Sequence, residues 1–194
     1  MPDTLMAYTP LGSRADGELK SHGSEAKVML TEVSPSTMID LRLDPRDAAC
    51  VKAAGDALGI GLPLASNTAT AIDTRTVWWL GPDQWLVVAP AAGGDALVDA
   101  LSAVVPSAVN VSDLRAEFEL AGPHAADVLR KGCGIDLHPR EFRAGDCAMT
   151  QLARVRAGIR QIDERPAYRI LVERSVATYL WDWLTDAMRE FTGK

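Results

Sequence analysis

The sequence is poor in cysteine and histidine, and it lacks a long apolar run. Three cysteines and three histidines occur among its 194 residues. The cysteines have no C-x-x-C spacing, so we expect neither a disulfide framework nor a zinc ribbon, but free thiols in a reducing compartment. No apolar stretch reaches the roughly 18 residues of a membrane-spanning helix. The N-terminus has no basic start followed by an apolar segment, so we expect no secretory signal and a cytoplasmic protein.

An excess of basic residues is also missing. The chain carries 20 Lys and Arg against 26 Asp and Glu, which gives a net charge of −6. Proteins that bind nucleic acid usually show a basic excess on the domain or on one face, and anionic membranes attract basic segments. We therefore expect neither nucleic acid nor a membrane as a partner of this chain.

Catalytic and cofactor-binding motifs are absent as well. A hydrolytic triad needs a base beside its nucleophile, but the sequence holds only His22, His124 and His138 and has no G-x-S-x-G. Gly55 and Gly59 end a helical pattern, whereas a dinucleotide-binding turn places glycine before the helix. We therefore predict no catalytic residue, no metal ligand and no cofactor-binding residue. This favours a binding or structural subunit over a free-standing enzyme.

Alternating and helical patterns divide the chain into three parts. Residues 1–27 mix glycine with scattered charges and are predicted to form a flexible tail, whose alternative role is an arm that orders against a partner subunit. Residues 28–111 and 112–194 each show a β-α-β-β-α-β-like order of strands and helices. These two halves predict an α+β fold with mostly antiparallel sheets and packed helices.

Within the first half, the alternation over 36–43 predicts a strand, and Asp44 followed by Pro45 predicts the start of a helix. Residues 59–70 have the composition of a loop.

A hairpin is predicted around the turn formed by residues 81–84. This turn would place Leu80 opposite Trp85, with Trp78 on the same face as Trp85 and Trp79 on the other. Both faces are apolar, so we expect the hairpin to be covered on both sides.

Within the second half, the alternation over 114–120 predicts a strand with one wet face. Residues 135–145 form a predicted loop before a strand over 147–156, and Ala157 with Gly158 is predicted to turn that strand back. The stripe of apolar residues over 176–188 is the strongest helical pattern in the chain.

Three arginines surround this second predicted turn, namely Arg154, Arg156 and Arg160. A solvated strand edge protected by charge is the favoured interpretation. The alternative is a patch that meets an acidic subunit surface or an anionic ligand. Among the tryptophans, Trp79 is predicted to face a partner, because aromatic residues anchor interfaces.

Several segments resemble the gamma subunit family of heterotetrameric sarcosine oxidase, in the same order over roughly residues 36–190. They are WLGPDQWL at 79–86, VSD at 111–113, LAGPHA at 120–125, KGCGIDLHPR at 131–140 and the stretch 174–184.

This resemblance implies a fold similar to the folate-binding domain of the glycine cleavage T-protein. It also implies a complex that oxidises sarcosine to glycine, with release of hydrogen peroxide and of formaldehyde or methylene-tetrahydrofolate. The implied partners are alpha, beta and delta subunits, which would hold FAD, FMN, NAD and zinc, whereas this chain would bind none of these. Tetrahydrofolate is a further implied ligand of the complex, but the acidic motif with which the T-protein contacts folate has no counterpart in this sequence.

We hypothesise that the chain has a structural and assembly role. A loop over 136–145 is a candidate contact region, because long loops are often functional and because arginine and aromatic residues suit interfaces. A packed surface loop is the alternative. Two other hypotheses are a stand-alone folate-binding, aminomethyltransferase-like protein and a binding module that forms homo-oligomers when isolated. The predicted interface residues are Trp79, His138, Pro139, Arg140, Phe142 and Arg143.

Overall fold

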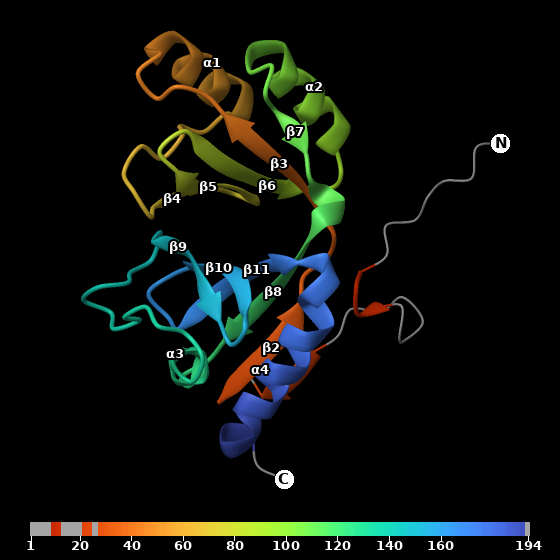
Figure 1. Ribbon diagram of the computed structural model, residues 1–194, viewed down its shortest axis with the longest axis vertical. Coiled ribbons are helices and arrows are strands. Elements are labelled where there is room, and N and C mark those ends of the chain that lie inside the picture. The colour runs from red at the N-terminus through yellow and green to blue at the C-terminus, as the bar shows by residue number, and fades with distance from the viewer. Residues whose placement is uncertain (1–8, 13–20, 25–26, 193–194) are drawn as a thin grey trace, which may run out of the picture.

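Two antiparallel sheets with helices on their outer faces make up the computed structural model, which describes residues 9–12, 21–24 and 27–192 (Figure 1). The layers run helix, sheet, sheet, helix. The predicted α+β architecture with mostly antiparallel sheets is thereby confirmed. None of the helices in these ranges combines the length and the apolar character that crossing a membrane requires.

The five-stranded sheet has the strand order β4-β5-β6-β3-β7. Helices α1 (Ala48–Leu58) and α2 (Gly94–Val104) cover its outer face, where Leu58 and Leu101 are buried together with Leu41. Its strands are β3 (Ser36–Arg42), β4 (Ala69–Ile72), β5 (Arg75–Gly81), β6 (Gln84–Pro90) and β7 (Val109–Asn110).

The six-stranded sheet has the strand order β1-β2-β8-β11-β10-β9. Helices α3 (Ala125–Arg130) and α4 (Ala177–Thr192) cover its outer face. The Phe118 ring of β8 meets Trp181 of α4 edge-on, with 5.5 Å between the ring centroids. The strands of the six-stranded sheet are β1 (Ser21–Ser24), β2 (Val28–Glu32), β8 (Arg115–Ala121), β9 (Cys147–Leu152), β10 (Val155–Gln161) and β11 (Ala167–Glu173).

The inner faces of the two sheets pack on each other. Besides the two apolar cores between each sheet and its helices, this packing buries an apolar cluster between the sheets, to which both sheets contribute side chains. Because helices cover the outer faces, the central strands are buried on both sides, and β6 has five consecutive buried residues. The prediction that the hairpin is covered on both faces is confirmed. The inter-sheet cluster consists of Met38, Trp78, Leu86, Val88, Cys147 and Leu171.

The register of the β5–β6 hairpin corrects the predicted grouping of its tryptophans. Trp79 lies opposite Trp85 and Trp78 opposite Leu86, and an irregularity falls between Trp79 and Gly81. An extra residue in one strand shifts the pairing by one, and a shift by one moves each side chain to the other face. Trp78 therefore lies in the inter-sheet cluster, whereas Trp85 lies in the helix-side core.

Helix α1 begins three residues later than the Asp44-Pro45 signal predicted. The residue that caps it is Asp47, whose carboxylate accepts a hydrogen bond from the backbone N–H of Cys50 at 3.0 Å. Asp44 instead holds the side chain of Arg46. Strand β4 (Ala69–Ile72) begins within the stretch predicted as loop, because its pairing with β5 outweighs its loop-like composition.

The predicted turn at Ala157-Gly158 is also wrong, since both residues lie within β10. The chain turns at Ala153, which takes a φ of 54°. A Cβ at Gly158 would lie 3.0 Å from Met149 Sδ and 3.3 Å from the Trp78 ring. The glycine therefore allows close approach of the two sheets instead of a turn.

The two sheets do not coincide with the predicted halves 28–111 and 112–194. Strand β2 (Val28–Glu32) lies in the first of these halves but pairs with β8 in the six-stranded sheet. Within the predicted tail over 1–27, Leu11 is buried and β1 pairs with β2, so the tail prediction fails for these residues. The remaining part of that prediction, at 1–8, 13–20 and 25–26, lies outside the described residues.

A comparison of Gly122 with Gly93 tests how much the close contact between Gly122 and the backbone of Lys27 contributes to stability. Both have a positive φ, 120° and 79°, but a Cβ at Gly122 would lie 2.7 Å from the Lys27 carbonyl oxygen, whereas nothing lies within 4 Å at Gly93. We expect Gly93→Ala to lower the free energy of unfolding by about 1 kcal/mol and Gly122→Ala by about 3 kcal/mol. Urea denaturation measures both, and equal losses would contradict the importance of the contact with Lys27.

Candidate functional site

Charged side chains occupy part of the junction between the two sheets. Arg169 of β11 lies 3.6 Å from the Glu117 carboxylate and 2.9 Å from that of Glu119, both on β8. Arg160 of β10 lies over the Trp78 ring, 5.8 Å from its centroid. The predicted wet face of strand 114–120 is therefore wrong at Glu117, which is only 8% exposed and whose carboxylate lies against Arg169.

Burial controls the ionisation of these groups. It raises the pKa of Glu117, against the attraction of Arg169 and Arg160. It also lowers the pKa of Arg160 and raises that of the Cys147 thiol to about 11. The Cys147 thiol hydrogen bonds to the Thr68 carbonyl at 3.2 Å. A thiol that remains protonated at neutral pH is a poor nucleophile, so this layer joins the sheets and has no evident reactive group.

The loop between α3 and β9 extends from the side of the molecule (Figure 1). It has no helix or strand over 136–145, as predicted. Leu137 and Phe142 are buried in the core under α3 and α4. The backbone N–H of Phe142 donates to the His138 carbonyl at 2.9 Å, and Arg143 Nη2 donates to the Arg140 carbonyl at 2.9 Å. Two apolar anchors and local hydrogen bonds thus hold the loop in one conformation.

The predicted interface residues divide into two groups in this structure. His138, Pro139, Arg140 and Arg143 are exposed. Phe142 is 6% exposed and belongs to the protein's own core, so the proposal that it contacts a partner is corrected. An aromatic residue in a loop can contact a partner protein or can anchor the loop in the protein's own core. The sequence pattern is the same in both cases, and the packing distinguishes them.

Trp79 is half-buried and packs against the core under α1 and α2. Its strand is joined to the loop, because the Trp79 N–H donates to the Thr68 carbonyl and the next residue, Ala69, donates to the Gly145 carbonyl at 2.7 Å. The structure therefore brings the end of the loop beside the strand of Trp79.

The histidines have structural partners in the described part of the chain. His124 Nδ1 lies 3.2 Å from an Asp127 carboxylate oxygen, and the His124 ring stacks on Phe191 at 4.4 Å. His138 Nδ1 accepts a hydrogen bond from the backbone N–H of Arg140. Over the described ranges, no group of three or more His, Cys, Asp or Glu residues is placed to hold a metal ion.

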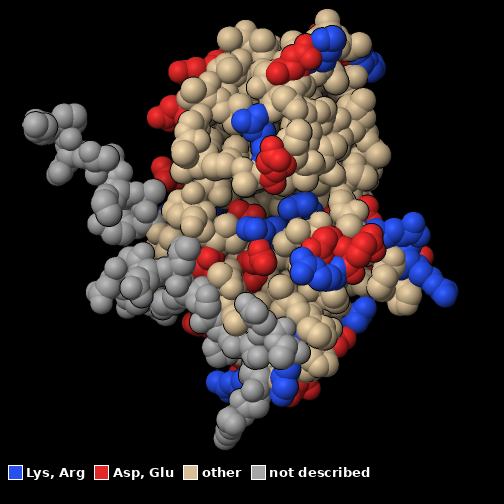
Figure 2. Space-filling view, turned by 180° about the vertical axis from the view of Figure 1, so that it is seen from behind, with Lys and Arg blue, Asp and Glu red and all other residues tan. Residues whose placement is uncertain are grey.

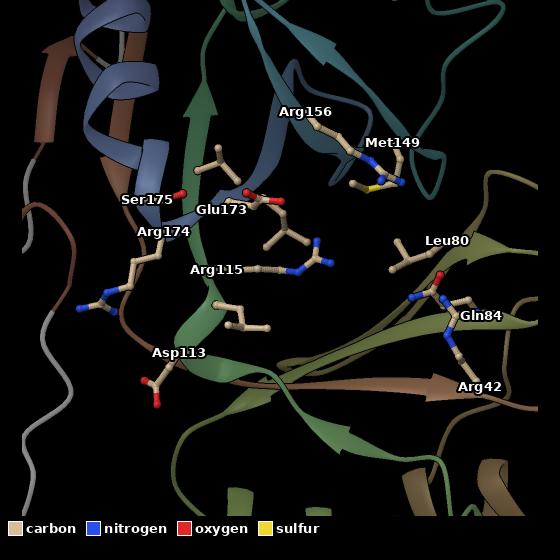
Figure 3. Close-up of a pocket in the computed structure, with 13 residues that line it drawn as sticks. Arg42, Leu80, Gln84, Asp113, Arg115, Met149, Arg156, Glu173, Arg174 and Ser175 are labelled. Atoms are coloured by element: carbon tan, nitrogen blue, oxygen red, sulfur yellow. The ribbon is translucent and has the colours of Figure 1, made fainter.

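A cavity of about 690 Å³ lies between the two sheets, and no pattern in the sequence predicted it. Its walls include Arg115 of β8 and Arg156 of β10 (Figure 3). The alternation of β8 could have drawn attention to Arg115. The convergence of the two strands on one cavity is a property of the folded chain.

Known proteins with a similar sequence share one description. The sequence model of the sarcosine oxidase gamma subunit family matches residues 42–190. The sarcosine oxidase subunit gamma of an Arthrobacter species is 37% identical over 178 residues, covering 90% of this chain and 87% of the relative. That of Corynebacterium sp. strain P-1 is 35% identical over 182 residues, covering 91% and 88%.

Solved structures give the same result at the level of the fold. A chain of the heterotetrameric sarcosine oxidase from Corynebacterium sp. U-96, solved in complex with pyrrole 2-carboxylate, has a TM-score of 0.84 and 33% identity and covers 97% of both chains. The aminomethyltransferase T of the glycine cleavage system from Bartonella henselae has a TM-score of 0.65 and 16% identity, covering 92% of this chain and 56% of that one. The second likeness confirms the expected fold and carries no functional conclusion.

We expect Phe142→Ala to lower the free energy of unfolding by about 3–5 kcal/mol, because it leaves a cavity in the core. Arg140→Ala removes an exposed side chain of the same loop and should change it by less than about 0.5 kcal/mol. Urea denaturation of both variants provides the measurement. A stable Phe142→Ala variant would show that the side chain is not an anchor of the loop.

The Cys147 thiol makes stability depend on pH in the alkaline range. Its pKa rises from 9.0 to about 11 on folding, so the folded state holds the proton more tightly. The resulting stabilisation is complete below pH 9 and is lost as the pH rises through 11. Relative to Cys147→Ala, the wild type should therefore lose up to about 2–3 kcal/mol over this window. Urea denaturation under reducing conditions tests this, and a difference that is constant with pH would contradict it.

Proposed function

The chain belongs to the sarcosine oxidase gamma subunit family and is the gamma subunit of a heterotetrameric sarcosine oxidase, in which we propose that it has a structural role and no catalytic residue. The observation that carries this proposal is the similarity over 97% of both chains to a chain of a solved heterotetramer. His124 and His138 support it, since the side chain of each is engaged by its own neighbours.

The complex that we propose contains alpha, beta and delta subunits beside this chain. It oxidises sarcosine to glycine, reduces oxygen to hydrogen peroxide and yields formaldehyde or methylene-tetrahydrofolate. FAD, FMN, NAD and zinc belong to the partner subunits in this proposal. The three cysteines are all free thiols, which supports a reducing, cytoplasmic location.

We place the contact with partner subunits on the loop surface, defined by His138, Pro139, Arg140 and Arg143. All four residues are exposed, and the buried Leu137 holds the segment that carries them. A loop already held in one conformation loses little entropy on binding, and arginine is enriched in protein interfaces. Trp79, at the edge of the five-stranded sheet's core, is a secondary candidate because its strand adjoins the end of this loop.

The alternative is a stand-alone folate-binding, aminomethyltransferase-like protein. Its support is the fold shared with the aminomethyltransferase of Bartonella henselae. One fold hosts many functions, so this support is weaker than the match to the gamma subunit family.

We expect the double variant Arg140→Ala with Arg143→Ala to lose its partner subunits. Two exposed arginines at an interface centre contribute enough that their removal should lower recovery of the complex about tenfold or more. Co-purification of the tagged chain with its partner subunits measures this, with the melting temperature of the isolated chain as a check on folding.

The matched control for this experiment is Arg46→Ala. Arg46 is exposed and paired with Asp44 near the start of α1, away from the loop surface. Unchanged recovery of the complex in the double variant, or an equal loss in the control, would remove the loop surface from the interface.

A further inference from the structure

The cavity between the two sheets has the size of a small-molecule site. Its volume of about 690 Å³ falls within the range of roughly 300–1,000 Å³ typical of ligand pockets. Both sheets contribute to its walls, and the exposed side chains of Leu114 and Arg156 lie at its edge. The lining residues used below are Leu80, Arg115, Met149, Arg156, Leu171 and Glu173.

Two arginines point into this cavity from different strands. Arg115 extends into it from β8, and Arg156 reaches toward it from β10 (Figure 3). Burial lowers the pKa of Arg115, the charge of Asp40 opposes this, and repulsion from Arg156 lowers it further. The two guanidinium groups are thus close enough to repel each other. Among the described residues, neither of them has a partner in a hydrogen bond or an ion pair.

The carboxylates near the cavity leave this positive charge unneutralised. Asp40 already accepts a hydrogen bond from Gln84 Nε2 at 2.6 Å and lies 3.9 Å from Arg42. Glu173 is exposed and attracts Arg115 without forming an ion pair with it. Asp113 and Arg174 both point away from the centre of the cavity (Figure 3). Charged residues gather across the middle of the molecule (Figure 2), and Arg115 and Arg156 are charged cavity residues without an ion-pair partner in the described part of the chain.

Part of the wall is apolar, with Leu80 from β5, Met149 from β9 and Leu171 from β11. We propose that the cavity binds a small organic anion, whose carboxylate pairs with Arg115 and Arg156 and whose apolar part contacts these three side chains. Planar guanidinium groups match the geometry of a carboxylate, and a partly buried site strengthens that pairing. This site is independent of the structural role proposed above.

An NMR titration of the full chain, labelled with ¹⁵N, tests this site. The probes are 3-phenylpropionate, which joins a carboxylate to an apolar ring, and 3-phenylpropionamide, which has the same shape without the charge. We expect the carboxylate to shift signals of β8 and β10, to bind more weakly as sodium chloride is added, and to bind at least about tenfold more tightly than the amide.

Three variants localise the binding. Arg115→Gln and Arg156→Gln should each weaken binding of 3-phenylpropionate about tenfold, because each removes a charged hydrogen-bond donor. Arg154→Gln is the matched control, since Arg154 is exposed, lies two residues from Arg156 and does not line the cavity. If Arg115→Gln fails to fold, Arg115→Lys keeps the charge but not the planar fork and should still weaken binding.

Three results would each overturn the proposal. The first is a dissociation constant for 3-phenylpropionate weaker than about 10 mM, and the second is an equal affinity for the amide. The third is an equal weakening of binding by Arg154→Gln. Should the isolated chain ignore both probes while Arg115→Gln lowers recovery of the assembled complex, the cavity takes an acidic segment of a partner subunit instead. Failure of the loop surface variants to affect assembly would leave this site untouched.

Discussion

The two sheets pack face to face, and this contact determines which side chains of the central strands are buried. Helices cover both outer faces, so the polar side chains of the central strands, such as Glu117 and Arg169, lie on the inner faces and must find their partners within the protein. The distance between the sheets depends on Gly158, where a Cβ would meet Met149 Sδ and the Trp78 ring. A side chain at this position would require the Met149 side chain and the Trp78 ring to shift by a few tenths of an ångström within a packed cluster.

The junction changes in character from the packed cluster to its edge. Near its centre Trp78 and Leu171 exclude water, and beside them Arg160 lies over the Trp78 ring. Glu117 and Arg169 neutralise each other within the protein. Elsewhere along the junction, Arg115 and Arg156 line a cavity between the sheets and form no ion pair with the described carboxylates near it. The junction therefore holds the two sheets together through its apolar cluster and also carries positively charged side chains in the cavity.

The same junction fixes the loop that we assign to partner contacts. The end of this loop is joined to the five-stranded sheet, since the Cys147 N–H donates to the Asn67 carbonyl and the Ala69 N–H to the Gly145 carbonyl. Its middle is held by Leu137 and Phe142 in the core of the six-stranded sheet. A segment anchored at its middle and at its end can present a constant surface, which is what the proposed contact with partner subunits requires.

The class of fold, the principal strands and helices and the family were predictable from the sequence, because periodicity and motifs such as KGCGIDLHPR are local properties of the chain. The sequence also located the loop over 136–145. The folded chain was needed to show that Trp78 faces the other sheet, that Phe142 is an anchor, that Gly158 lies within a strand and that Arg115 and Arg156 line one cavity. Each of these depends on strand register or on the approach of segments distant in sequence, where a shift of one residue exchanges the two faces of a strand.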